Sequence, residues 1–236
     1  MSEKSLLSGY FNGFSAKPYS EKCCGFTLAE VLITLVIVGV IASMTIPTLM
    51  NNTKKQEFVS QLTKTYSTLS QGLNSIWNKN DTAPGDYEFF TTHNFMDEFA
   101  KVTNIQKKCS TIFECTGSNI YDNHRWLNGN TMSSTVYGDG KTVIMSDGQM
   151  ISFVNYVMAT YGLSAEDTEN VVGRFLVDVN GNKGPNKIGI DTFTFYLIRG
   201  KGIVPAGIDS VTNCAKNQLG KDCTAKVLKE KAINYI

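Results

Sequence analysis

A single carboxylate, Glu30, lies inside an apolar run that extends from Phe26 to Met50. About 20 apolar residues in a helix span the hydrocarbon core of a bilayer, so the run predicts a transmembrane helix rather than a buried core helix. An ionisable group in such a segment is costly and normally has a partner. Glu30 therefore either pairs with an opposite charge or lies close enough to the interface to stay hydrated.

The residues Gly25-Phe26-Thr27-Leu28-Ala29-Glu30 resemble the processing motif of type IV prepilins and type II secretion pseudopilins. The apolar run that follows, with Pro47 near its end, is also similar to that family. The resemblance implies that prepilin peptidase, a membrane aspartyl peptidase, cuts between Gly25 and Phe26 on the cytoplasmic side. It also implies that the new amine of Phe26 is methylated and that Glu30 pairs with the terminal amine of a neighbouring subunit.

The resemblance further implies a partner set and a location. The partners would be other pilin or pseudopilin subunits, an inner-membrane assembly platform and membrane lipid. The chain would cross the bacterial inner membrane once, with a cytoplasmic leader and an extracytoplasmic domain, and would then enter a pilus or pseudopilus. Two alternatives stay open: an uncleaved anchor that tethers a binding or enzymatic domain, and an ordinary signal peptide cut near Met44 or Thr45.

These features divide the chain into three parts. Residues 1–25 form the expected leader, residues 26–50 the expected membrane and filament-core helix, and residues 51–236 the expected globular domain. Beyond the apolar run, apolar residues recur at spacings of four and three, which predicts an amphipathic second half of the same helix. They are Phe58, Leu62, Tyr66, Leu69, Leu73 and Ile76. Pro47 should bend or locally melt the helix, because proline lacks the amide donor.

The fold expected for the domain is α+β, with the long helix packed on a small antiparallel sheet as in pilins. Strands are predicted at 141–145 and 150–156, joined by a turn that contains Asp147-Gly148. Further strands are predicted at 171–179, 192–199 and 202–204. Short helices are predicted within 94–105 and 223–236.

An Asp/Asn-rich loop joins two of these strands. Asp178, Asn180 and Asn182 alternate, and Asp191 ends the segment. Calcium takes six to eight oxygen ligands, which such a spacing can supply. Some pseudopilins have a calcium site near their late strands, a resemblance that adds to this hypothesis. The alternative is a loop of turn formers, in which Asn and Gly adopt left-handed conformations.

Four of the six cysteines form two close pairs, Cys109/Cys115 and Cys214/Cys223, without the CxxC spacing of a zinc site. Two local disulfides in an oxidising compartment are expected, with free thiols in a cytosolic protein as the alternative. The two histidines, His93 and His124, each lie alone in polar sequence and are predicted to be surface residues. The sequence contains no nucleophile elbow, phosphate-binding loop or zinc-protease motif, so a structural protein is expected rather than an enzyme.

Composition limits the other function classes. The 236 residues are 42% hydrophobic and 18% charged, which is typical of a globular chain rather than a disordered one. The net charge is +1, and no block of Lys and Arg is evident along the sequence. Nucleic-acid binding is therefore not expected, because it needs a basic face to displace counterions.

Overall fold

The computed structural model describes residues 25–117, 122, 124–132, 140–155 and 159–236. Residues 1–24, almost all of the expected leader, lie outside this set. The chain divides into two compact units, Met1–Pro47 and Thr48–Ile236. The second unit differs by a few residues from the predicted domain 51–236, whose role as a separate domain stays a prediction.

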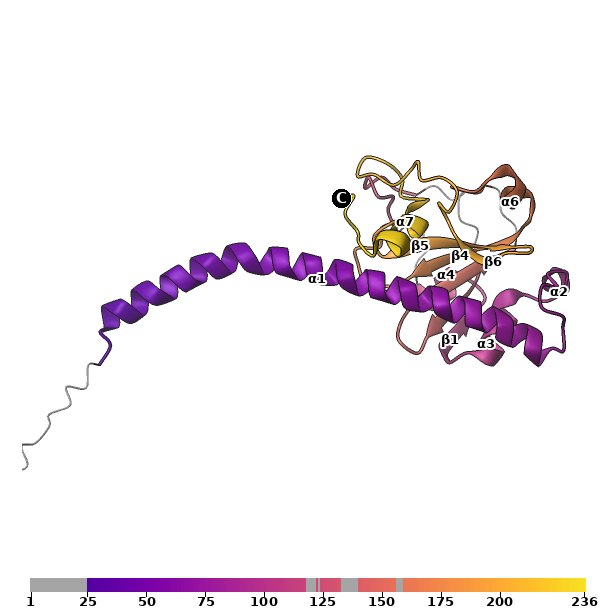
Figure 1. The fold of residues 1–236 in the computed structure, drawn as a ribbon. Coiled ribbons are helices and arrows are strands. Elements are labelled where there is room, and N and C mark those ends of the chain that lie inside the picture. The colour runs from indigo at the N-terminus through magenta and orange to yellow at the C-terminus, as the bar shows by residue number, and fades with distance from the viewer. Residues whose placement is uncertain (1–24, 118–121, 123, 133–139, 156–158) are drawn as a thin grey trace, which may run out of the picture. The chain divides into compact units, whose positions relative to one another are not determined.

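The described chain begins with one long helix, α1, which spans Leu28–Lys79. This confirms the prediction of a single helix with an apolar and an amphipathic part. Pro47 lies inside α1, with helical residues on both sides. The bend or local melting predicted at Pro47 stays a prediction. Within the second unit, α1 lies across the sheet (Figure 1).

The amphipathic stripe of α1 forms one wall of the main core. Phe58, Leu62, Leu69, Leu73 and Ile76 are buried, and Tyr66 is partly buried with its ring stacked on Phe195 at 5.7 Å. A glycine completes this helix face, because a Cβ on Gly72 would lie 2.3 Å from Cε2 of Phe99. Gly72 thus allows α1 to approach Phe99 of α3 (Phe95–Val102) closely.

The sheet has six strands in the order β1-β2-β3-β4-β5-β6, and each neighbouring pair is antiparallel. The α+β architecture of a long helix on an antiparallel sheet is therefore as predicted. The strands are β1 (Ile105–Cys109), β2 (Lys141–Met145), β3 (Met150–Val154), β4 (Val171–Asp178), β5 (Thr192–Ile198) and β6 (Gly202–Pro205). The remaining helices are α2 (Phe89–Thr92), α3 (Phe95–Val102), α4 (Ile112–Thr116), α6 (Ala165–Glu169) and α7 (Cys223–Glu230).

The predicted hairpin is confirmed between β2 and β3. Its turn closes with a hydrogen bond from the amide of Met145 to the carbonyl of Gln149, at 2.8 Å, and Gly148 has φ 87°. The strand β1 was not predicted. The short helix expected within 94–105 ends at Val102, and Ile105 instead begins this edge strand, where three successive residues are exposed.

Both faces of the sheet are covered, which follows from the alternation of side chains along a strand. Phe153, Phe175 and Phe195 lie in the core cluster with α1 and α3. On the opposite face, Leu176 lies in a cluster with Trp126 and Ile188. The ends of β4 and β5 are thus held between two apolar layers, and this arrangement positions the buried polar groups described below.

Candidate functional site

The residues at the start of α1 form a capping box. The amide of Glu30 donates to the hydroxyl of Thr27 at 3.2 Å. The Glu30 carboxylate in turn accepts hydrogen bonds from the amide and the hydroxyl of Thr27, both at 2.8 Å. A Thr-x-x-Glu sequence satisfies otherwise unpaired amides at a helix start in this way. Glu30 therefore has a structural role that sequence reasoning missed, although Thr27 three residues earlier was the available signal.

The peptide bond between Gly25 and Phe26 lies just before this cap. Both residues are exposed and non-helical, and Phe26 has 88% of its surface accessible. A Cβ on Gly25 would meet no atom within 4 Å. Among the described residues, nothing covers the Gly25–Phe26 peptide bond, so another protein can reach it from Phe26 onward.

The segment after the cap has the dimensions of a membrane span. Within the described residues, α1 contains a stretch that is long and apolar enough to cross a bilayer, judged by length and composition. Its large side chains are exposed, including Leu32, Val36 and Ile41 at 54%, 66% and 57%. In water such a continuous apolar surface would be costly, so it requires lipid or protein around it.

A buried cluster of titratable side chains lies where β4 ends and β5 begins. Nε2 of His124 lies 3.0 Å from Oδ2 of Asp178, and both side chains are almost fully buried. Asp191 is also fully buried, and its carboxylate accepts hydrogen bonds from the amides of Asn186 and Lys187, each at 2.7 Å. The prediction that His124 is a surface residue was wrong, whereas His93 is exposed as predicted.

Local backbone bonds bring these distant residues together. The amide of Arg125 donates to the carbonyl of Asn186 at 2.9 Å, and the amide of Ile188 donates to the carbonyl of Arg125 at 3.0 Å. This short parallel bridge places His124 beside the loop. No local sequence pattern indicates this bridge, because His124 and Asp178 are 54 residues apart.

Burial controls the charge state of the two carboxyl groups. The pKa of Asp178 is raised to about 6, chiefly by burial: the negative charge of Asp191 also raises it, and the hydrogen bond with His124 lowers it. Burial likewise raises the pKa of Asp191, against the lowering effect of the amides of Lys187 and Asn186. Two carboxylates close together in an apolar setting disfavour their charged forms, which is the physical cause.

The calcium hypothesis can be compared with these contacts. Buried amide oxygens of Asn180 and Asn186 accept no hydrogen bond from the described residues, and calcium uses such oxygens. The carboxylates of Asp178 and Asp191, however, accept hydrogen bonds from protein donors. Across the described ranges, no group of three or more His, Cys, Asp and Glu side chains is placed to hold a metal ion.

The loop conformation agrees with the second alternative, a loop of turn formers. Gly181, Asn186 and Gly189 have φ of 67°, 50° and 84°, in the left-handed region that Gly and Asn tolerate. Asn182 is exposed. The contacts thus favour a hydrogen-bonded loop, and calcium binding by Asp178, Asn180, Asn182 and Asp191 stays a prediction.

The four paired cysteines form two disulfides, Cys109–Cys115 and Cys214–Cys223. The first joins the end of β1 to α4. The second joins the segment after β6 to the start of α7, where Cys214 and Cys223 pack with Leu127. Each bridge ties a short surface loop to the core.

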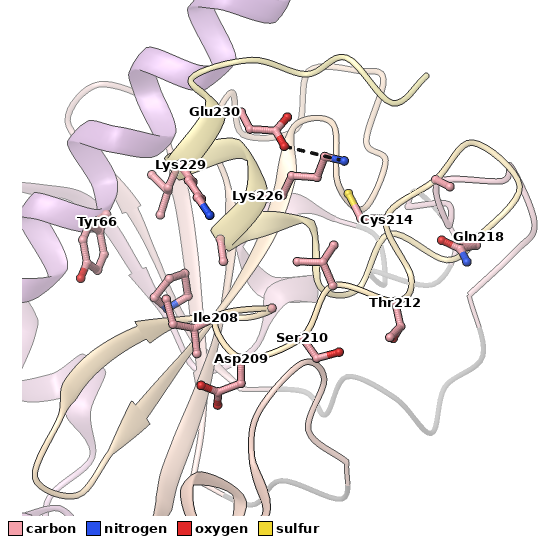
Figure 2. Close-up of a pocket in the computed structure, with 16 residues that line it drawn as sticks. Tyr66, Ile208, Asp209, Ser210, Thr212, Cys214, Gln218, Lys226, Lys229 and Glu230 are labelled. Carbon is pink, nitrogen blue, oxygen red and sulfur yellow. Dashed lines mark ion pairs between the residues drawn. The ribbon is translucent and has the colours of Figure 1, made fainter.

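A surface pocket of about 810 Å³ lies between α7, the segment 205–218 and Tyr66 of α1 (Figure 2). Its charged groups are largely partnered: Lys226 lies 3.9 Å from Glu230, and Asp209 accepts a hydrogen bond from the amide of Ser164 at 2.7 Å. Cys214 is in its disulfide, so it supplies no nucleophile. The pocket therefore offers a shape but no evident reactive group.

The N-terminal segment matches a known motif. The prokaryotic N-terminal methylation motif matches residues 21–46. The type II secretion system core protein G of Aeromonas hydrophila is 37% identical over 76 residues, which cover 25% of this chain and 53% of that protein. In its N-terminal segment, the chain is therefore similar to pilins and pseudopilins. No solved structure matches the chain.

Pilins and pseudopilins are structural proteins. The similarity of this chain to them is limited to part of its sequence. The chain spans about half the length of the curated relative it matches. The matched motif contains Gly25, Phe26 and Glu30 and ends just before Pro47. The buried His124 cluster, the two disulfides and the last three strands lie outside the matched motif. The comparisons therefore concern the N-terminal segment, and the domain has to be interpreted from its own contacts.

Proposed function

We propose that this chain is a structural subunit of a type IV pilus-like filament or a type II secretion pseudopilus. Prepilin peptidase cuts it after Gly25 and methylates the new terminus at Phe26. The observation that carries the proposal is the combination of the methylation motif at residues 21–46 with a helix that begins at Leu28 and is apolar and exposed over the following turns. Such a surface has a use only in lipid or against other helices.

The proposed assembly step concerns Glu30. In the precursor its carboxylate is engaged by Thr27 at the start of α1. After cleavage, the amine of Phe26 on a neighbouring subunit provides a positive partner, and pairing offsets the cost of placing both charges among apolar helices. The capping box keeps the unassembled helix start satisfied until that partner arrives.

The further partners are the inner-membrane assembly platform, other pilin or pseudopilin subunits and membrane lipid. The domain faces the extracytoplasmic side, which agrees with the disulfides Cys109–Cys115 and Cys214–Cys223. A catalytic role is not part of the proposal.

Mass spectrometry of the N-terminus of the chain isolated from its membranes tests the proposal. A methylated Phe26 is the expected result. An intact Met1 would instead indicate an uncleaved anchor that tethers the domain. A start near Met44 or Thr45 would indicate an ordinary signal peptide. Either of these two results would overturn the proposal.

A further inference from the structure

A pocket of about 650 Å³ beside the first domain turns of α1 is lined by four lysines. Lys54 and Lys55 come from α1, Lys187 from the segment between β4 and β5, and Lys216 from the segment before α7. The remaining lining residues are mostly apolar or neutral: Asn51, Phe58, Leu127, Gly184, Pro185, Ile190 and Ile236. Residues far apart in the sequence thus concentrate positive charge in one place, which the chain's net charge of +1 does not indicate.

The positive charge of this lysine pocket is not neutralised by ion pairs. Within the described ranges, none of the four lysines lies within 4.0 Å of an Asp or Glu oxygen. The lining contains no Asp or Glu side chain. Glu57 borders the neighbouring pocket, where it accepts a hydrogen bond from Gln61 at 3.2 Å. Four ammonium groups that repel one another favour a bound anion.

The position of the pocket indicates which anion. The apolar run ends at Met50, so Lys54 lies about 6 Å further along the helix at a rise of 1.5 Å per residue. If α1 is a membrane anchor, as the proposed function holds, this distance places the pocket at the level of the lipid headgroups. Lys and Arg near a membrane surface are attracted to anionic lipids. The apolar wall formed by Phe58, Leu127 and Ile190 suits the first acyl-chain carbons of a lipid.

We propose that the lysine pocket binds the phosphate of an anionic phospholipid headgroup while the subunit resides in the membrane. The inference rests on the proposed function for its depth in the bilayer. The decisive residues are Lys187 and Lys216, since Lys54 and Lys55 would meet headgroups on any anchored helix. The folded domain adds the other two charges, which turns a juxtamembrane stretch into a site.

The test uses the full chain, purified in a neutral detergent, with equal amounts of phosphatidylglycerol and phosphatidylcholine added. Native mass spectrometry then gives the ratio of the two lipids that remain bound. The double variant Lys187→Gln/Lys216→Gln should lower this ratio about tenfold, since each lysine contributes substantially at a membrane surface. The matched control is Lys107→Gln/Lys229→Gln, which changes the charge equally at exposed positions outside the pocket and should leave the ratio unchanged.

Each other outcome overturns the proposal. An equal fall in the control would show attraction by bulk charge alone. An unchanged ratio in the pocket variant, with loss of filaments, would assign the lysines to a subunit contact. Complete displacement of phosphatidylglycerol by millimolar inorganic phosphate would show a site for free phosphate. The lipid ratio is measured on the uncleaved chain, so an intact Met1 in cells would refute the proposed function without deciding this test.

Discussion

At the scale of residues, the roles of two carboxylates depend on which groups donate hydrogen bonds to them. Glu30 accepts hydrogen bonds from Thr27 at an exposed helix start. Asp178 accepts from His124 and from the amide of Asn180 in a fully buried cluster. The first can exchange its donors for a new partner because it is accessible, whereas the second is locked inside the fold. Substitutions at the two sites should therefore affect different properties.

Glu30 separates the role of the charge from the role of the cap. Glu30→Gln keeps an oxygen acceptor near Thr27 and removes the charge, so we expect normal cleavage and poor assembly. Thr27→Val removes the capping hydroxyl and keeps the charge, at a cost of about 1 kcal/mol to the helix start, so assembly should persist. Filament yield in sheared fractions, with the ratio of mature to precursor chain, measures both. Full assembly of Glu30→Gln would refute amine pairing.

Asp178 should make stability depend on pH. Its pKa rises from 3.8 to about 6 on burial, so the folded state holds a proton that the unfolded state has lost. The stability that this protonation adds to the folded state is fully present below pH about 4 and is lost as the pH rises to about 6. It is at most roughly 3 kcal/mol.

Chemical denaturation at pH 4.5 and pH 7 measures this effect. The unfolding free energy of wild type, relative to Asp178→Asn, should be larger at pH 4.5. The exposed Glu169→Gln should show no such difference. A constant gap between wild type and Asp178→Asn would contradict the assignment.

Calcium provides a third test at this scale. Because protein donors already occupy the carboxylates of Asp178 and Asp191, millimolar calcium should leave the thermal midpoint of the full chain unchanged. A rise that is abolished by Asp191→Asn, and by a chelator, would establish a calcium site instead.

At the scale of elements, helices and strands could be predicted from the sequence wherever the spacing of apolar residues was regular. The α1 stripe, the β2–β3 hairpin and strands β4 to β6 follow from apolar spacing and turn residues. The edge strand β1 could not be recognised, because its residues Gln106, Lys107 and Lys108 are all exposed and show no alternation. The bridge that buries His124 and the convergence of Lys187 and Lys216 arise from tertiary contacts, which no local pattern encodes.

Gly72 offers a direct test of how closely α1 packs against Phe99. Alanine there should gain about 1 kcal/mol in helix propensity, but its Cβ would lie 2.3 Å from Phe99. Overpacking of a core costs about 1–3 kcal/mol, so we expect a net loss of stability. The control is Asn74→Ala at an exposed position two residues further along α1, which should be neutral or slightly stabilising. Urea denaturation compares them, and a more stable Gly72→Ala would show that Phe99 can move aside.

At the scale of the whole molecule, the two units differ in where their apolar residues lie. The buried hydrophobic residues of the described chain all lie at Phe58 or beyond, inside the unit Thr48–Ile236. The large apolar side chains of residues 26–47 are exposed. The core of the domain is therefore complete without residues 26–47, which serve location and assembly in the proposed function.

A chain that begins at Thr48 should accordingly be soluble and fold alone. Its thermal midpoint in buffer should equal that of the full chain in neutral detergent, because no buried core residue has been removed. Circular dichroism and gel filtration provide the measurement. An aggregated or unfolded product would show that residues before 48 support the domain.

The two outer strands have a consequence for the proposed life of this protein in a membrane among copies of itself. β1 carries the exposed Lys107 and Lys108, and β6 is a short strand that ends at Pro205. Charged residues, short length and proline each hinder one sheet from extending into another. Neighbouring copies would therefore have little opportunity to join by amyloid-like pairing of their sheet edges. In the proposed filament, subunit contacts would then be made by the α1 helices instead.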